Sequence, residues 1–522
     1  MDDGGRVLRL AKPKRKGLLN IVFSRLLIIV LLMAAQVGLL VWLLTWARGY
    51  LPHYATVQIV FTACMILYLF NSRGDASSKL TWMWLIALFP LAGAGFLLFT
   101  QLNIGNRTIH RRTAELIDKT RDALPQNGDV LARLDGDIYG TDDLCRYLNH
   151  SGCFPIYDQC EVRYFPLGDD MFPVLLEELE RAEKTIFLEF FIIEEGYVWG
   201  RVLDILSRKA AQGVDVRVMF DGMCEIFQLP YDYVKRLEAL GIRAKSFSPV
   251  RPFLSTHYNY RDHRKIAVID GSVAFTGGVN LADEYMNRIK RFGHWKDSAV
   301  MVRGDAARSF LLMFLQMWGI TEKEPDFSPC DRRMTEPIEA PGAVLPFADC
   351  PLDAYRVGES VYIDMLYRAN TYVHIMTPYL ILDGEMETAL QYAAERGVDV
   401  KLILPGVPDK KTAFALAKSH YAALTEAGVR IYEYTPGFVH AKNVVSDGVR
   451  AVVGTINMDY RSFYHHFECA LYMYETPCVA DIEADFQGTL AQCREVTPES
   501  IRQEKLFYRL LGGVLKLIAP LM

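Results

Sequence analysis

HRKIAVIDGSVAFTGGVN, residues 263–280, and HAKNVVSDGVRAVVGTIN, residues 440–457, share one layout. In each stretch a histidine and a lysine stand two residues apart, an Asp-Gly pair follows, and an asparagine lies 17 residues after the histidine. Alternate residues of a strand share a face, so the histidine and the lysine point the same way. Asp-Gly between two apolar runs is a strong signal for a tight hairpin. Both stretches are therefore predicted to be β-hairpins that carry a paired imidazole and ammonium.

The rest of the chain repeats in the same register. GVDV occurs at 213–216 and again at 397–400, 184 residues later, and the two histidine segments lie 177 residues apart. A domain-sized period indicates an internal duplication and not a solenoid. Before each GVDV stands an apolar strand, at 186–193 and at 372–381, and then a helical segment, as expected for a sheet covered on both faces. The predicted fold class is α/β, in two copies.

The side chains of the two segments suit an oxyanion. The candidate site is His263, Lys265, Asn280, His440, Lys442 and Asn457. One such set can hold a phosphate, and two sets suit a phosphodiester, because one histidine can attack phosphorus while the other protonates the departing alcohol. No carboxylate cluster of the kind that holds Mg²⁺ or Ca²⁺ accompanies the set, so neither a metal nor another cofactor is expected.

The aspartates of the two motifs call for a separate interpretation. Asp270 and Asp447 have the opposite strand parity to their histidines and stand at the predicted turns. We interpret them as mainly structural residues that hold the hairpin or nearby donors. The chemistry then depends on the histidines, the lysines and the asparagines.

The double motif resembles the phospholipase D superfamily, whose hallmark is H-x-K-x4-D followed by a glycine-rich turn and an asparagine. More narrowly, NYRDHRKIAVIDG, FTGGVNLADEY, TPYLILDG and VGTINMDYRSF resemble bacterial cardiolipin synthases. The resemblance covers nearly the whole chain. It implies two duplicated phospholipase D-like domains, each a mixed β-sheet flanked by helices, related by a pseudo-two-fold axis. It also places Asp270 and Asp447 in the catalytic motif. One departure is His466, where the family usually has asparagine before the Phe-Glu pair.

The resemblance also implies an acidic residue that holds each imidazole in one tautomer. In the second half this residue is Glu468, 28 residues after His440. In the first half the matching phrase HWKDSAVMVRG nominates Asp297. From the residues alone, either acid could instead be a surface charge.

The activity implied by the resemblance is that of a cardiolipin synthase, which converts two phosphatidylglycerol molecules into cardiolipin and glycerol through a phosphohistidine. By that analogy His263 attacks phosphorus and His440 serves as acid and then base, although the two motifs are equivalent by sequence. With one phosphate between them, the two imidazoles are expected to titrate as a coupled pair near neutrality, one neutral and one charged. The alternatives are a phospholipase D hydrolase, a phosphatidyltransferase such as phosphatidylserine synthase, a nuclease, and an inactive membrane scaffold.

Composition argues against nucleic acid as the main partner, whereas the lipid partners are implied by the resemblance. The chain has 57 Lys and Arg against 62 Asp and Glu, a net charge of −5, whereas proteins that bind a nucleic-acid backbone usually have a basic surface. The ten cysteines include no CxxC pair, so neither a zinc site nor a disulfide scaffold is indicated. Phosphatidylglycerol and membrane lipids are the expected partners, and the oligomeric state stays open.

The first hundred residues predict a membrane anchor. Apolar runs occupy Leu26–Ala47, Ala55–Phe70 and Leu80–Thr100, and a bilayer-spanning helix needs about 20 residues. Basic residues before the first run place the N-terminus in the cytoplasm. The third run contains Pro90 and is followed by further arginines, so we expect it to be re-entrant or tilted. The protein is then expected in the bacterial inner membrane as a multi-pass protein, with its catalytic part facing the cytoplasm.

These observations predict five regions. They are the anchor at 1–104, a linker region at 105–160, the first phospholipase D-like domain at 161–335, the second at 336–498, and an amphipathic tail at 499–522. Such a tail either lies at the membrane interface or packs on the catalytic part.

Overall fold

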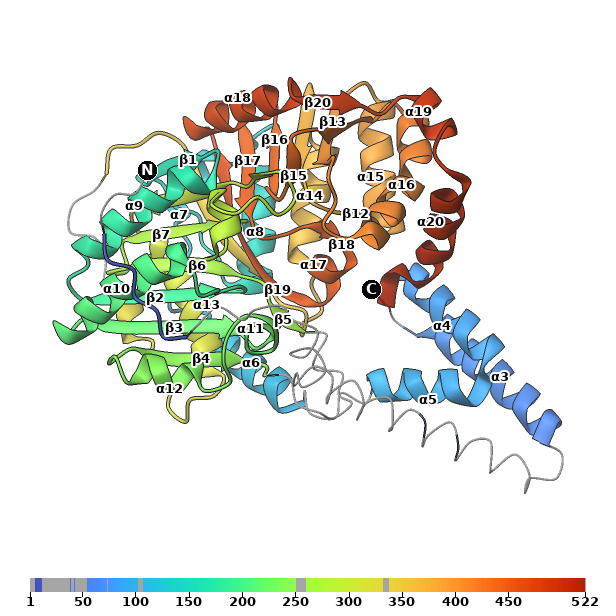
Figure 1. The fold of residues 1–522 in the computed structure, drawn as a ribbon. Coiled ribbons are helices and arrows are strands. Elements are labelled where there is room, and N and C mark those ends of the chain that lie inside the picture. Colours follow the sequence, from blue (N-terminus) through green and yellow to red (C-terminus); the bar gives the residue numbers. More distant parts are fainter. Residues whose placement is uncertain are drawn as a thin grey trace.

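A computed structural model describes residues 5–11, 38, 42, 54–72, 74–101, 107–249, 260–331 and 338–521. Within these ranges the body of the molecule holds two large mixed sheets with helices packed on them (Figure 1). All ten cysteines are free thiols.

The first sheet has seven strands in the order β1-β9-β7-β6-β2-β3-β4. Strands β2, β3 and β4 run parallel, whereas β6 and β7 form an antiparallel hairpin between β2 and β9. The strands span Glu161–Phe165 (β1), Thr185–Phe190 (β2), Asp215–Asp221 (β3), Arg243–Phe247 (β4), Lys265–Ile269 (β6), Val273–Gly277 (β7) and Ala299–Arg303 (β9).

The second sheet repeats this plan in the order β10-β19-β17-β16-β11-β13-β14-β20. Here β11, β13 and β14 are the parallel strands and β16–β17 is the hairpin. The strands span Ala343–Asp349 (β10), Tyr372–Met376 (β11), Asp399–Pro405 (β13), Arg430–Tyr434 (β14), Asn443–Ser446 (β16), Arg450–Gly454 (β17), His466–Tyr474 (β19) and Cys493–Glu495 (β20). The predicted α/β duplication is confirmed. The domain limits 161–335 and 336–498 stay a proposal, which the limits of the two sheets support.

Helices cover both faces of each sheet, which explains the uninterrupted apolar strands. In β2, Ile186 and Leu188 pack beneath α9 and α10, while Phe187 packs on the opposite side with α13. Because α13 is buried along its whole length, it is apolar on nearly every side. The helices of this part span Gly168–Arg181 (α9), Tyr197–Ala211 (α10), Met223–Phe227 (α11), Tyr233–Glu238 (α12) and Ala307–Gly319 (α13).

The second sheet is covered in the same way, by α14 and α15 on one face and by α18 on the other. Helices before and around this sheet span Arg107–Lys119 (α6), Gly128–Arg133 (α7), Thr141–Gly152 (α8), Val357–Tyr367 (α14), Gly384–Glu395 (α15), Lys411–Glu426 (α16), Tyr460–Tyr464 (α17), Cys478–Leu490 (α18) and Pro498–Arg502 (α19). Two small pairs complete the strands, β12 (Leu380–Ile381) with β18 (Met458–Asp459) and β8 (His294–Lys296) with β15 (Gly437–Val439).

Both hairpins have the turn that the sequence predicts. Asp270 and Gly271 have φ angles of 50° and 71°, and Asp447 and Gly448 have φ angles of 56° and 69°. Two consecutive residues with positive φ are the signature of the two-residue turn that joins twisted antiparallel strands. Glycine is needed at the second position because a left-handed conformation there carries no penalty for it.

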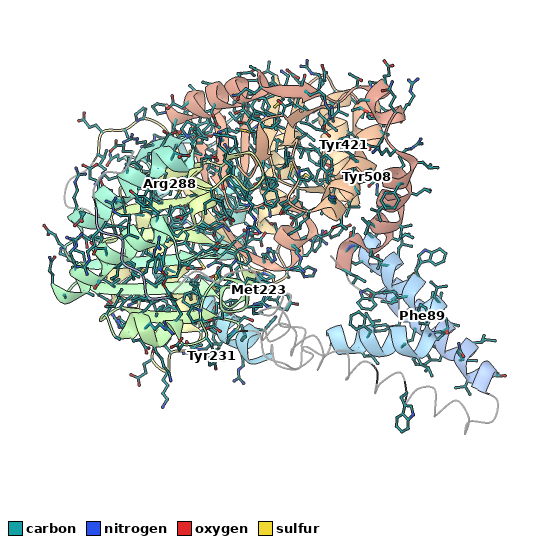
Figure 2. All side chains as sticks on the ribbon, viewed as in Figure 1. Phe89, Met223, Tyr231, Arg288, Tyr421 and Tyr508 are labelled. Carbon is teal, nitrogen blue, oxygen red and sulfur yellow. The ribbon has the colours of Figure 1, made fainter. Side chains whose placement is uncertain are left out.

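Three helices precede the body and project away from it (Figure 1). They are α3 (Tyr54–Asn71), α4 (Ala76–Leu88) and α5 (Pro90–Gln101). Helix α4 ends at Leu88 and α5 begins at Pro90, and Phe89 between them is exposed (Figure 2). The first apolar run, 26–47, lies outside the described residues apart from two isolated positions. Among the helices that are described, none combines the length and the apolar character required to cross a membrane.

The C-terminal helix α20 (Leu506–Ile518) lies between α16 and α4 (Figure 1). Gly512 allows the close approach, because a Cβ atom there would lie 2.6 Å from the carbonyl oxygen of Ala415. Leu515 packs against α16 with Leu416, and Thr81 of α4 donates a hydrogen bond to the carbonyl oxygen of Leu517 at 2.7 Å. The tail thus docks on the second half and on the N-terminal helices.

Candidate active site

Each motif histidine is attached to a strand of the other half. His263 follows the short strand β5 (Arg261–Asp262), which pairs with the start of β19, and its backbone N–H donates to the carbonyl oxygen of Phe467 at 3.0 Å. His440 follows β15, which pairs with β8, and its N–H donates to the carbonyl oxygen of Lys296 at 2.7 Å. The two attachments are pseudo-symmetric, and they carry both motifs to the seam between the sheets.

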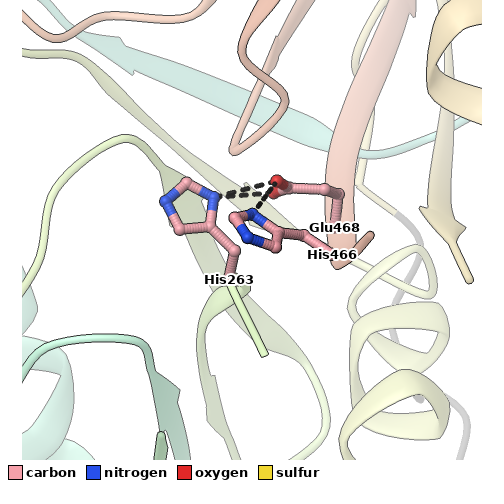
Figure 3. Close-up of side chains that lie close together, drawn as sticks. All are labelled: His263, His466 and Glu468. Atoms are coloured by element: carbon pink, nitrogen blue, oxygen red, sulfur yellow. Dashed lines mark hydrogen bonds and ion pairs between the residues drawn. The ribbon is translucent and has the colours of Figure 1, made fainter. Parts of the chain in front are cut away.

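The imidazoles pair with acids across this seam. His263 Nδ1 lies 2.9 Å from both carboxylate oxygens of Glu468 (Figure 3), and His440 Nδ1 lies 2.6 Å from Oδ2 of Asp297. The sequence nominated both acids, and the structure adds that each serves the histidine of the opposite half. A carboxylate on Nδ1 holds the proton there and leaves Nε2 with its lone pair for chemistry.

Both acids are fully buried, and one residue beside each acid suits the length of its side chain. Thr455 donates a hydrogen bond to Oε2 of Glu468. The matching position of the first half is Gly278, where a Cβ atom would lie 2.0 Å from Oδ1 of Asp297 and 2.9 Å from the carbonyl oxygen of His440. Gly278 in TGGVN therefore leaves room for the carboxylate of Asp297, whereas Thr455 in VGTIN donates a hydrogen bond to Glu468.

The two lysines are buried beside their histidines. Lys265 Nζ donates to the carbonyl oxygen of His263 at 2.5 Å, and Lys442 Nζ lies 2.9 Å from His440 Nδ1. Burial lowers the pKa of Lys265 to about 8 and that of Lys442 to about 7. The charges of both Glu468 and Asp297 act on each lysine and raise its pKa, and Lys265 lowers the pKa of Lys442. The two motif sets therefore form one electrostatic site.

Burial also controls the protonation of the two imidazoles. It lowers the pKa of His440 to about 4 and places the pKa of His263 well below its usual value, against the opposing effect of the paired acids. Burial alone would raise the pKa of Glu468, but His263 holds it well below its usual range. The sequence-based expectation of one charged imidazole concerns rings that flank a phosphate, and for that state it stays a prediction. Both rings favour the neutral form until an anion lies between them.

Some buried polar atoms of the motif asparagines and of Trp295 have no partner among the described residues. Asn280 accepts a hydrogen bond from the N–H of Ile192 at 2.9 Å, but its Nδ2 has no partner in this part of the chain. Asn457 Oδ1 and Trp295 Nε1 likewise lack one among the described residues. An unsatisfied buried polar atom costs about 1–3 kcal/mol, so such atoms mark a place where a polar ligand is expected.

Sequence reasoning did not identify Thr455 or the aromatic residues of the site. The rings of Tyr285 and Trp295 each lie 5.4 Å from that of His440, and Phe191 lies 5.0 Å from His263. One available signal was the position two residues before each acid, which holds Trp295 in one half and His466 in the other. Aromatic rings therefore lie against both histidines.

The motif aspartates lie at the turns and bind backbone. Asp270 accepts hydrogen bonds from the N–H groups of Glu183, Lys184 and Thr185 at 2.7–2.8 Å. Asp447 accepts three in the same way, from residues 370–372 at 2.8–2.9 Å. Burial alone would raise the pKa of Asp447, but these bonds hold it below its usual value. The geometry supports our structural interpretation of both residues.

We expect Asp447→Ala to lower the free energy of unfolding by about 2–4 kcal/mol, because three backbone donors lose a charged acceptor. The fraction that folds should retain its kcat. Denaturant unfolding and kcat corrected for the folded fraction check this, with Asp481→Ala on the surface of α18 as the control. A stable variant with a kcat reduced more than a hundredfold would instead assign Asp447 to the chemistry.

Comparisons with known proteins agree with this geometry. A family model described as "Cardiolipin synthase, PLD-like domain" matches residues 175–318 and 362–490, more than half of the chain. An uncharacterized protein of Streptococcus mutans serotype c is 54% identical over 461 residues, 88% of this chain and 99% of that protein. The cardiolipin synthase of Alkalihalophilus pseudofirmus is 33% identical over 490 residues, 91% of this chain and 96% of that enzyme.

Among solved structures, the phosphatidylserine synthase of Haemophilus influenzae matches with a TM-score of 0.54. The match covers 69% of this chain and 93% of that chain at 14% identity. At such an identity the likeness shows a shared fold.

Proposed function

Because the chain belongs to the cardiolipin synthase family of phospholipase D-like proteins, we propose that it joins two phosphatidylglycerol molecules into cardiolipin and releases glycerol. The observation that carries this proposal is the pair of crossed histidine–acid contacts, which presents two neutral imidazoles at one seam. Transfer between two phosphodiesters conserves the bond type, so no nucleotide is required.

In the first step, His263 Nε2 attacks the phosphorus of one lipid and the bond from phosphorus to the glycerol oxygen breaks. Glu468 holds the proton on Nδ1 and stabilises the charge that the ring acquires. The anionic substrate raises the pKa of His440, so this ring can carry the proton that the leaving glycerol takes. The product of this step is a phosphatidyl group on His263 and free glycerol.

In the second step, His440 removes the proton from the terminal hydroxyl of a second phosphatidylglycerol. That oxygen attacks phosphorus, and the bond to His263 breaks. Asp297 holds His440 in the tautomer that both steps need. Lys265 and Lys442 neutralise the phosphate oxygens, and the unpaired Nδ2 of Asn280 supplies a further donor.

The lysines predict the alkaline limb of the pH profile. Substrate binding to the free protein needs both ammonium groups, whose pKa values are lowered to about 8 and about 7. We expect kcat/KM to be level between about pH 5 and pH 6, to fall above about pH 7 as Lys442 loses its charge, and to fall more steeply above about pH 8 as Lys265 does. Initial rates in detergent micelles measure this profile, and rates that stay level to pH 10 would refute the prediction.

A membrane location is part of the proposal, with the catalytic part at the cytoplasmic face of the inner membrane. The outer face of α20 leaves large apolar side chains exposed, which are Leu506, Phe507, Leu510, Val514 and Leu517. The adjoining helices α3 and α4 expose others, among them Ile59, Phe70 and Trp84. Monomeric soluble proteins rarely expose a large contiguous apolar patch, so this surface favours contact with lipid.

We expect Leu510→Asp combined with Val514→Asp to reduce the rate on phosphatidylglycerol vesicles at least tenfold. Each side chain contributes about 1.5–3 kcal/mol when it enters an apolar phase. The rate on short-chain phosphatidylglycerol dispersed below its micellar concentration should change little. Ile138→Asp combined with Ile289→Asp, two exposed apolar positions of the body, is the control. An equal loss on both substrates would speak against a lipid-facing α20.

Product analysis tests the proposed reaction. Purified full-length protein with phosphatidylglycerol alone should yield cardiolipin and glycerol in equal amounts by lipid mass analysis. Phosphatidic acid without cardiolipin would identify a hydrolase. Phosphatidylserine formed from a CDP-linked lipid and serine, without cardiolipin, would identify the other transferase.

A further inference from the structure

A third potential ligand stands beside one of the two histidine–acid pairs. His466 lies next to His263 and Glu468, and its Nδ1 is 3.5 Å from Oε1 of Glu468 (Figure 3). The imidazole rings of His263 and His466 have centroids 5.3 Å apart. One ligand atom from each of the three residues lies within 4.8 Å of the others. Two imidazoles and a carboxylate therefore converge on one point.

His466 lacks a hydrogen bond of its own within the described part of the chain. It is only 7% exposed, yet neither ring nitrogen has a hydrogen-bond partner there. The pseudo-symmetric position in the other half is Trp295, whose indole cannot coordinate a metal. The three-ligand arrangement is therefore specific to the pair His263–Glu468, and the pair His440–Asp297 serves as an internal comparison.

We propose that His263, Glu468 and His466 form a zinc site that regulates the protein by inhibition. Zinc bonds to imidazole nitrogen and carboxylate oxygen at about 2.0–2.2 Å, so tetrahedral ligands stand about 3.3–3.5 Å apart. The separations from Oε1 of Glu468 are 2.9 Å to His263 Nδ1 and 3.5 Å to His466 Nδ1. Thr455 already binds Oε2, so Oε1 is the oxygen left for the metal. A fourth position remains for water.

Zinc at this point would replace the proton between His263 and Glu468. The metal withdraws electron density from the ring and occupies the acid that orients it, so Nε2 becomes a poor nucleophile. Lys265 opposes binding by its charge, and the carboxylate of Glu468 compensates for part of the metal's charge. The inhibition rests on the proposed role of His263 in catalysis, whereas the binding does not.

The first test measures binding without reference to activity. Metal-free full-length protein in detergent is titrated with Zn²⁺ by calorimetry and with Co²⁺ by its visible absorption. We expect one binding site in the wild type. Loss of an outer-shell partner lowers metal affinity roughly 10–100-fold, and His466→Asn should lower it by more than this because it removes a ligand. His465→Asn, the same change at the adjacent residue, is the matched control. Equal binding by wild type and His466→Asn would overturn the proposal, as would equal weakening by both variants.

X-ray absorption of the zinc-loaded wild type identifies the ligands directly, so the proposal can be tested even if a variant fails to fold. Two imidazoles with oxygen ligands are expected, and a sulfur ligand from any of the ten cysteines would overturn the proposal. The second test measures synthesis of cardiolipin against Zn²⁺ concentration, each variant relative to its own metal-free rate. Inhibition should follow site occupancy and should be relieved in His466→Asn. Full activity with zinc bound would overturn both the inhibition by zinc and the catalytic role of His263. If the metal-free protein makes no cardiolipin, only the proposed function is refuted.

Discussion

Replacing His263 by alanine should reduce cardiolipin formation by at least about 10³-fold, and so should replacing His440. His263 forms the bond to phosphorus and His440 transfers the proton in each step. Removing one of two residues that act as a unit already loses most of the rate. The double variant should therefore be little worse than either single one. Lipid mass analysis of initial rates measures this effect.

The two single variants should differ in what they accumulate. With labelled phosphatidylglycerol, His440→Ala retains the nucleophile and should accumulate a phosphatidyl group on His263 during long incubation. Loss of His440 slows formation of this group, but it also slows the transfer to a second lipid and the hydrolysis that would remove it. His263→Ala should hold none. A label mapped to His440 would reverse the two roles, and a variant with full synthesis would refute the mechanism.

His374 offers a matched control within the same chain. It is a buried histidine whose Nδ1 contacts both carboxylate oxygens of Glu483 at 3.0 Å, so its pairing resembles that of His263. It lies in β11 and stacks between Tyr372 and Phe486, in another part of the second sheet. His374→Ala should affect stability and leave the rate per folded molecule close to that of the wild type.

Removing the acids should be the next largest effect. Glu468→Gln and Asp297→Asn keep the shape of each side chain but lose the charge that fixes the tautomer and stabilises an imidazolium. We expect kcat to fall by about 10²–10⁴-fold in each variant, with little change in folding. Stopped assays over a wide time range are needed to measure these rates.

The crossed pairing gives this prediction a sharper readout. In ¹⁵N spectra of the imidazoles, Glu468→Gln should shift the Nδ1 signal of His263 and leave that of His440 nearly unchanged. Asp297→Asn should do the opposite, and Glu483→Gln should shift only His374. A shift of His263 on loss of Asp297 would contradict the pairing described above.

The hairpins and the duplication that the sequence predicts are confirmed, and the six polar residues stay the candidate site. Asp-Gly specifies the turn locally, and strand parity sets the face of His263 and Lys265, so neither inference needs knowledge of distant contacts. The family resemblance supplied Glu468 and Asp297. Local rules could not show that these acids exchange partners, because that depends on how β5 meets β19 and β15 meets β8.

Ionisation was the least accessible property. Ordinary pKa values apply to rings in contact with water, and the sequence does not show how far an imidazole is buried. His263 and His440 are instead 7% and 8% exposed, and burial favours the neutral form. Likewise, Gly278 looks like an ordinary turn glycine in the sequence, and only the position of Asp297 explains it.

The exchange of acids between the two halves has a consequence for how such a chain could arise. A single half in isolation would hold an imidazole without its carboxylate and a carboxylate without its imidazole. Two identical copies docked about a two-fold axis would repair both defects at once, so a one-copy chain with this layout would need to dimerise to complete its site. Trp295 opposite His466 and Gly278 opposite Thr455 are positions where the two halves differ.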